Sequence, residues 1–87
     1  MASTPSLRVE LVTARGCHLC DAARSVVGRV RSEVEFDFVE TDITGVPELE
    51  ARYRERIPVV LVDGVEAFHY HVHPDGLRQR LSRAQSR

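Results

Sequence analysis

The two cysteines of the sequence, Cys17 and Cys20, stand at Cys-x-x-Cys spacing between two segments with different hydrophobic periods. Residues 7–12 alternate apolar and polar side chains, which predicts a β-strand with one apolar face. From Cys17 to Arg31 the apolar residues recur at three- and four-residue steps, which predicts an amphipathic helix. A cysteine pair at the point where a strand is followed by a helix is typical of a redox-active dithiol.

The position of the pair at the start of a helix favours different roles for its two sulfurs. Cys17 lies nearest the free N–H groups and the positive dipole of the helix N-terminus, which favour a thiolate, the nucleophile of thiol–disulfide exchange. Cys20 lies one turn further in, and we expect it to be less exposed and placed to attack a mixed disulfide on Cys17. We therefore predict Cys17 as the nucleophile and Cys20 as the resolving cysteine. A zinc site and an inert pair of core cysteines are the alternatives, although a closed zinc site usually needs four ligands and the chain has one pair.

The chain has 87 residues, of which 43% are hydrophobic and 29% charged, and this predicts one small soluble domain. We expect the domain to span residues 7–83, with flexible tails at residues 1–6 and 84–87. The net charge of −1 argues against nucleic acid or a membrane surface as a partner. The first residues lack a secretory signal and no segment is long enough to span a bilayer, so we expect a cytoplasmic protein, with a monomer as the default. In the cytoplasm a disulfide is usually transient and catalytic.

The rest of the chain predicts five further elements in the order strand, helix, strand, strand, helix. They are a strand at residues 34–40, a helix from Pro47 capped by Asp42 or Thr44, a buried strand at residues 57–62, a returning strand at residues 65–72, and a last helix opened by residues 73–75 with Leu77 and Leu81 as its apolar contacts. A hairpin turn at Asp63-Gly64 joins the buried strand to the returning strand. Pro58 is expected at the first position of the buried strand, because proline cannot donate to a sheet ladder. The initial strand–helix–strand order implies a parallel first pair.

Three histidines, His69, His71 and His73, alternate along the returning strand and are predicted to share one face of it. Together with Cys17 and Cys20 they suggest a zinc site. The returning strand is expected to be an edge strand, separated from the cysteines by the strand before it. We therefore interpret the histidines as a solvated face and predict no metal site.

The order and spacing of these features resemble the glutaredoxin branch of the thioredoxin-fold superfamily, and most closely its short bacterial glutaredoxin-like proteins. The resemblance rests on the Gly16-Cys17-x-x-Cys20 motif, the Arg-Ile-Pro-Val segment at residues 56–59 and the Asp63-Gly64 hairpin, and it covers about residues 7–81. It implies an α/β fold of the thioredoxin-like type, β-α-β-α-β-β-α, with a four-stranded mixed sheet flanked by helices. It also implies a thiol–disulfide oxidoreductase that reduces protein or glutathione mixed disulfides.

The resemblance implies substrate-binding roles for five further residues. The Ile57–Pro58 peptide bond would be cis, with Pro58 against the cysteines and the backbone of Ile57 free to pair with an extended substrate. Arg15 matches a basic residue that pairs with a substrate carboxylate in relatives that bind glutathione. The alternative interpretation of Arg15 is a solvated charge in a loop. His18 and Leu19 fill the dipeptide between the cysteines, where glutaredoxins commonly carry Pro-Tyr and thioredoxins Gly-Pro.

The expected partners are disulfide-containing proteins or glutathione mixed disulfides as substrates, and glutathione or a reductase as the electron donor. No bound cofactor is expected, and glutathione is a candidate co-substrate, although the Gly-Gly region of glutathione-binding relatives is missing here. Two other functions stay open: a carrier of a metal or an iron–sulfur cluster, and a non-catalytic interaction module with a thioredoxin fold. Cycling between dithiol and disulfide separates the enzyme from the module, and a metal-loaded protein would support the carrier.

Overall fold

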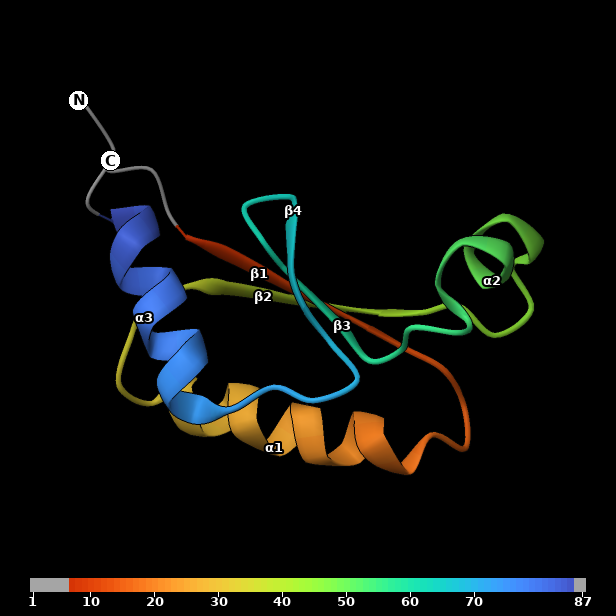
Figure 1. The fold of residues 1–87 in the computed structure, drawn as a ribbon, viewed down its shortest axis with the longest axis horizontal. Coiled ribbons are helices and arrows are strands. Elements are labelled where there is room, and N and C mark those ends of the chain that lie inside the picture. The colour runs from red at the N-terminus through yellow and green to blue at the C-terminus, as the bar shows by residue number, and fades with distance from the viewer. Residues whose placement is uncertain (1–6, 86–87) are drawn as a thin grey trace.

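A four-stranded mixed sheet with the strand order β2-β1-β3-β4 forms the centre of the molecule (Figure 1). The computed structural model describes residues 7–85. Its elements are β1 (Arg8–Thr13), α1 (His18–Arg31), β2 (Asp37–Asp42), α2 (Pro47–Tyr53), β3 (Val59–Val62), β4 (Val65–His69) and α3 (Pro74–Gln85). β1 pairs with β2 in parallel and with β3 antiparallel, and β3 pairs with β4 antiparallel. The predicted order of elements and the mixed sheet are confirmed.

Apolar side chains cover both faces of the sheet, because alternate residues of a strand point to opposite faces. The larger cluster joins the sheet to α1 and α3, which lie together on one side of it in Figure 1. Its buried members are Leu7, Val9, Leu11, Ala23, Val27, Val30, Phe36, Val60, Val62, Val72, Leu77 and Leu81. The smaller cluster, on the other face, consists of Val12, Ile43 and Val59, with Leu49 and Tyr53 of α2 packed against it. The smaller cluster lies at the end of β1 that leads to the cysteines.

The starts of β2 and β3 and the cap of α2 differ from the predicted ones. β3 begins at Val59 rather than at residue 57, so Pro58 precedes the strand instead of occupying its first position. β2 begins at Asp37 rather than at residue 34, because residues 33 and 34 extend the end of α1 by donating their N–H groups to Val30 O, each at 2.9 Å. The cap predicted for α2 is wrong: its N-cap is Val46, which makes no side-chain hydrogen bond. Asp42 and Thr44 serve the preceding loop instead, since Asp42 Oδ1 accepts from Thr44 N at 2.8 Å.

The returning strand is shorter than predicted and is interrupted by a register shift between Val60 and Leu61 of its partner. β4 ends at His69, and Tyr70 follows with a φ of +64°. The strand alternation therefore does not continue beyond His69, and the prediction that the histidines at 69, 71 and 73 share one strand face is wrong. Tyr70 is exposed rather than in phase with the half-buried Phe68. β4 is an edge strand, as predicted.

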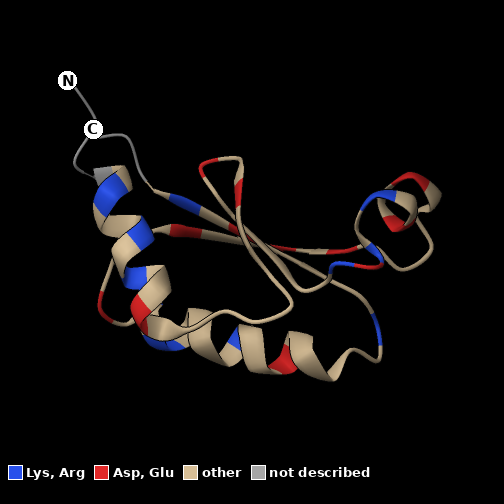
Figure 2. Ribbon diagram, in the orientation of Figure 1, with Lys and Arg blue, Asp and Glu red and all other residues tan. Residues whose placement is uncertain are grey.

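The last helix extends two residues beyond the boundary expected at residue 83, and Ala84 packs against the larger cluster. The tail predicted at residues 1–6, and residues 86–87 of the tail predicted at residues 84–87, lie outside the described residues. Within residues 7–85, no helix has the length and apolar character that crossing a membrane requires. Basic and acidic residues are interspersed along the elements (Figure 2). Arg78 of α3, for example, pairs with Glu33 at 2.6 Å and with Asp75 at 2.8 Å.

Candidate active site

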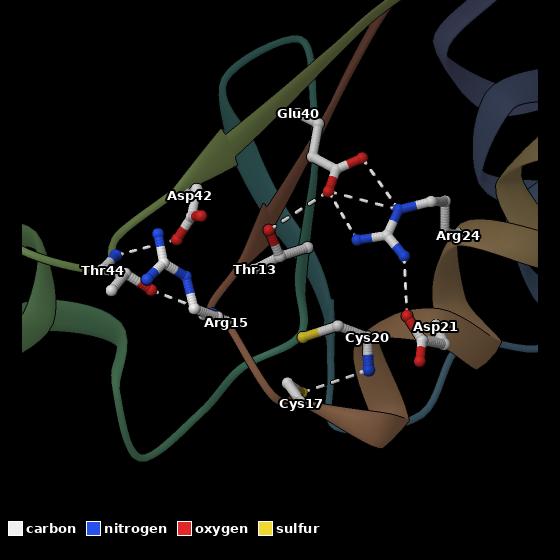
Figure 3. Close-up of polar contacts among 9 residues, drawn as sticks. All are labelled: Thr13, Arg15, Cys17, Cys20, Asp21, Arg24, Glu40, Asp42 and Thr44. Atoms are coloured by element: carbon white, nitrogen blue, oxygen red, sulfur yellow. Dashed lines mark hydrogen bonds and ion pairs between the residues drawn. The ribbon is translucent and has the colours of Figure 1, made fainter.

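Cys17 occupies the N-cap position of α1, with an extended backbone of φ −93° and ψ 111°. Its Sγ accepts a hydrogen bond from the backbone N–H of Cys20 at 3.1 Å (Figure 3). A serine or aspartate oxygen commonly makes this contact at the start of a helix, where it satisfies an N–H group that has no partner within the helix. The N–H donor and the positive end of the helix dipole both interact more favourably with a thiolate than with a thiol.

Cys20 differs from Cys17 in exposure and in acidity. Cys17 is half-buried, whereas Cys20 is only 1% exposed, and both are free thiols, so the predicted difference in exposure is confirmed. Burial raises the pKa of Cys20 to about 12, and the hydrogen bond with Cys17 also acts to raise it, while a backbone hydrogen bond from Ala14 and the charge of Arg24 oppose the rise. Cys20 therefore keeps its proton at neutral pH.

A charged network joins the first turns of α1 to β2 beside Cys20 (Figure 3). Arg24 donates from Nη2 to Glu40 Oε2 at 2.6 Å and from Nε to Oε1 at 3.0 Å, and its Nη1 contacts Asp21 Oδ1 at 2.8 Å. The hydroxyl of Thr13, at the end of β1, donates to Glu40 at 3.3 Å. The hydrogen bonds from Arg24 lower the pKa of Glu40. Sequence reasoning missed Glu40, because its position follows from the pairing of β1 with β2 and no local motif marks it.

The Ile57–Pro58 peptide bond is cis, as the resemblance to glutaredoxins implied. Val12 lies opposite Val59 in the antiparallel pair of β1 and β3. The turn that follows β1 and the residues that precede β3 therefore lie at the same end of the sheet. Ala14 and Ile57 both pack against the smaller cluster, so two segments far apart in the sequence share one apolar support.

Residues 8–82 match the family described as "Glutaredoxin-like domain (DUF836)". The chain belongs to this glutaredoxin-like family. An uncharacterized protein of Mycobacterium tuberculosis is 35% identical to the glutaredoxin-like domain over 82 residues, which span 88% of this chain and 84% of that protein. The structure of the X. campestris protein XcR50 is similar with a TM-score of 0.75 at 28% identity, over 86% of this chain and 96% of that one.

The structure of chloroplastic thioredoxin z is similar with a TM-score of 0.77 at 13% identity, over 94% of this chain and 80% of that one. At this identity the similarity concerns the fold, and it confirms that the glutaredoxin-like domain has the predicted thioredoxin-like architecture. Family, fold and the proximity of Cys17 to Cys20 together indicate a redox-type function.

Three of the residues predicted to bind substrate lie around the cysteines of the glutaredoxin-like domain. His18 and Leu19 are exposed in the first turn of α1, with Leu19 40% exposed. Arg15 is also exposed, and its backbone N–H donates to Thr44 Oγ1 at 2.9 Å. The guanidinium of Arg15 lies beside Asp42 in Figure 3. The backbone N–H of Thr44 lowers the pKa of Asp42, and the charge of Arg15 lowers it further. A contact between these residues and a substrate stays a prediction.

The other two, Ile57 and Pro58, lie before β3. Pro58 is buried and Ile57 is half-buried. Across residues 7–85, no three side chains from His, Cys, Asp and Glu are grouped so that they could hold a metal ion.

Proposed function

We propose that this glutaredoxin-like domain is a dithiol oxidoreductase that reduces disulfides, with Cys17 as the nucleophile and Cys20 as the resolving cysteine. One observation carries the proposal: Cys17 Sγ accepts the backbone N–H of Cys20 at 3.1 Å at the start of α1, while the Cys20 side chain is 1% exposed. An accessible sulfur with an N–H donor and a buried sulfur one turn away match the two roles that thiol–disulfide exchange requires.

The proposed reaction has two exchange steps. The Cys17 thiolate attacks one sulfur of a substrate disulfide, whose S–S bond breaks, and the displaced substrate thiolate takes up a proton. Cys20 then loses its proton and attacks Cys17 Sγ, which forms the Cys17–Cys20 disulfide and releases the second substrate sulfur as a thiol. The substrate gains two electrons and two protons. Glutathione or a reductase returns the electrons to the Cys17–Cys20 pair.

The raised pKa of Cys20 supports this order of events. A buried thiol with a pKa of about 12 stays protonated at neutral pH and does not compete with Cys17 for an external disulfide. Cys20 needs to react only after a substrate has been attached to Cys17, when the attack is intramolecular and is favoured by proximity.

Substrate binding is proposed at the segment before β3. Among the described residues, no hydrogen bond joins the backbone of Ile57 to another residue. An extended substrate could therefore pair with Ile57 by strand addition, which places its sulfur near the cysteine-bearing end of the sheet. Arg15 is proposed to bind a substrate carboxylate such as that of glutathione, and His18 and Leu19 to contact the substrate beside Cys17.

A redox titration of the purified protein in glutathione buffers, read by mass spectrometry, tests the proposed function. A cooperative Cys17–Cys20 disulfide, absent in the Cys20→Ser variant, is the expected result. A glutathione mixed disulfide on Cys17 during the titration would support glutathione as a partner. If both thiols stayed unpaired across cytosolic glutathione potentials, roughly −220 to −320 mV, the proposed function would be overturned.

A further inference from the structure

Tyr70 follows β4 directly and has an unusual backbone for a large side chain. Its φ of +64° lies in the left-handed region, which bulky residues rarely occupy. The side chain is 44% exposed, so packing in the core does not account for this conformation. A residue kept in a sparsely populated conformation at the surface often has a local role that depends on it.

The contacts of Tyr70 point to the segment with the cis proline. Its backbone N–H donates to Pro58 O at 2.9 Å, and its hydroxyl donates to Glu55 O. Glu55 and Pro58 lie on either side of Arg56 and Ile57. Tyr70 therefore holds the backbone before and after Ile57, the residue proposed to pair with the substrate, and residues 55–58 are called the substrate edge below. Both acceptors are backbone carbonyls, so the two contacts restrain the backbone conformation of residues 55–58.

A second contact from β4 reaches the same segment. Arg56 Nη1 donates to both carboxylate oxygens of Glu66, at 2.7 and 2.9 Å. Both side chains are partly exposed, so this ion pair is expected to contribute less than the contacts of Tyr70. Residues 55–58 are thus attached to the edge strand and the residue that follows it.

We propose that Tyr70 is a positioning residue for the substrate edge: its hydroxyl and its left-handed backbone hold residues 55–58 so that Ile57 presents free backbone groups to an extended disulfide substrate. This inference rests on the proposed function and adds a residue outside the cysteine motif. An edge that is ordered before binding costs less conformational entropy when the substrate pairs with it. Tyr70 therefore acts on the binding of extended substrates and leaves the chemistry of Cys17 unchanged.

The Tyr70→Phe variant tests the inference, with Tyr53→Phe as its matched control. Tyr53 is the other tyrosine of the chain, and among the described residues its hydroxyl makes no hydrogen bond, so the control removes the same atom without removing a hydrogen bond. Its ring lies 5.7 Å from the guanidinium groups of Arg52 and Arg56, and phenylalanine retains an aromatic ring for these contacts. Two quantities are measured in both variants and in the wild type. The first is amide hydrogen exchange of peptides covering residues 54–60. The second is the rate constant for oxidation of the dithiol by a short extended peptide disulfide, divided by that for bis(2-hydroxyethyl) disulfide.

For Tyr70→Phe we expect faster exchange in residues 54–60 and a fall in the rate ratio of about three- to tenfold, the size expected for the loss of one hydrogen bond at an ordered site. The reaction with bis(2-hydroxyethyl) disulfide should be unchanged, and Tyr53→Phe should resemble the wild type. A Tyr70→Asn variant, which tolerates the left-handed backbone but loses the hydroxyl, should show at least the same fall.

Each other outcome overturns the inference. If Tyr70→Phe leaves the exchange unchanged, the hydroxyl does not order the edge. If the exchange rises but the rate ratio is unchanged, the order of the edge does not serve the substrate. If the wild type reacts with neither disulfide, the proposed function fails together with the inference. If the wild type reacts and Tyr70→Phe behaves like it, only the inference fails.

Discussion

The two segments that form the candidate site, the cysteine-bearing turn at residues 13–24 and the proline-bearing segment at residues 55–58, are held in different ways. In the first, the central contact joins Cys17 to a backbone group three residues later. In the second, Arg56 donates locally to the carbonyl oxygens of residues 52 and 53, and the remaining contacts come from Glu66 and Tyr70, ten to fifteen residues away along the chain. The reactive sulfurs are thus placed by local helix geometry, whereas the proposed substrate edge depends on the end of a neighbouring strand.

The largest effect is expected from Cys17→Ser, which should abolish exchange with any disulfide. Serine keeps an oxygen that can accept the N–H of residue 20, so the cap of α1 is retained and the loss is chemical. The measurement is the rate of disulfide reduction, with circular dichroism as the test of folding. Cys20→Ser is the control, since it should still react once and should accumulate a mixed disulfide on Cys17. Turnover in Cys17→Ser would contradict the assignment of the nucleophile.

The pKa of Cys20 predicts how the stability of the reduced protein changes in alkali. The pKa is raised from 9.0 to about 12 in the folded state, so above pH 9 the unfolded chain binds fewer protons than the native one. The free energy of unfolding should therefore fall by up to about 1.4 kcal/mol per pH unit between pH 9 and 12, and should show no contribution from Cys20 below pH 9. Urea unfolding at several pH values measures the slope.

The matched control for this slope is Cys20→Ala, because tyrosines also ionise in this range. The slope attributed to Cys20 is the difference between the two proteins. An equal slope in both would mean that Cys20 ionises alike in the folded and unfolded chains, and the order proposed for the two cysteines would lose its support.

The sequence predicted the cysteine-bearing turn better than the proline-bearing segment, for a physical reason. The cap formed by Cys17 depends on a spacing of three residues and on a helix whose apolar period is visible in the sequence. The left-handed Tyr70 follows a register shift in β4, and the alternation of residues 68–72 carried no sign of either. Even in the first segment, the partner of Arg24 was missed, because Glu40 lies beside it only through the pairing of β1 with β2.

Arg24 and Glu40 allow a test of whether long-range contacts also affect the cysteine-bearing turn. Arg24→Gln and Glu40→Gln break the same ion pair, so a purely structural effect would have the same sign in both. Arg24 lies one helical turn after Cys20 and its charge lowers the pKa of that thiol. We therefore expect Arg24→Gln to slow the resolving step by about threefold. Glu40→Gln removes a negative charge that partly neutralises Arg24, so it should accelerate the resolving step by a smaller factor.

The resolving step is measured by quenching a reaction with a peptide disulfide and following the decay of the mixed disulfide by mass spectrometry. The charged groups near Cys20 include Asp21, which lies on the same helix and also pairs with Arg24. Asp21→Asn should therefore act in the same direction as Glu40→Gln. Slowing in all three variants would show that the network only supports the structure of the turn.

The smallest effect is expected from Glu66→Gln, which removes the ion pair between β4 and the proline-bearing segment. Side chains that are 40% and 31% exposed should contribute less than about 1 kcal/mol to the free energy of unfolding. Glu33→Gln is the matched control, because Glu33 also forms two close contacts to one arginine, at 2.6 and 2.8 Å. Glu33 follows the C-terminal end of α1, whereas the cysteines lie at its N-terminal end. Urea unfolding should show a small loss of stability in both variants.

The two glutamate variants should differ in their reactivity with substrates. Only Glu66→Gln should lower the preference for an extended peptide disulfide over bis(2-hydroxyethyl) disulfide. The fall should be smaller than in Tyr70→Phe, because the amide oxygen of the new glutamine side chain can still accept one hydrogen bond from Arg56. A fall as large as that of Tyr70→Phe would assign the main support of the substrate edge to the ion pair. No fall in Glu66→Gln together with a clear one in Tyr70→Phe would assign the main support to the tyrosine, and the proposed substrate edge would then depend on a hydroxyl and a backbone conformation that lie outside the segment itself.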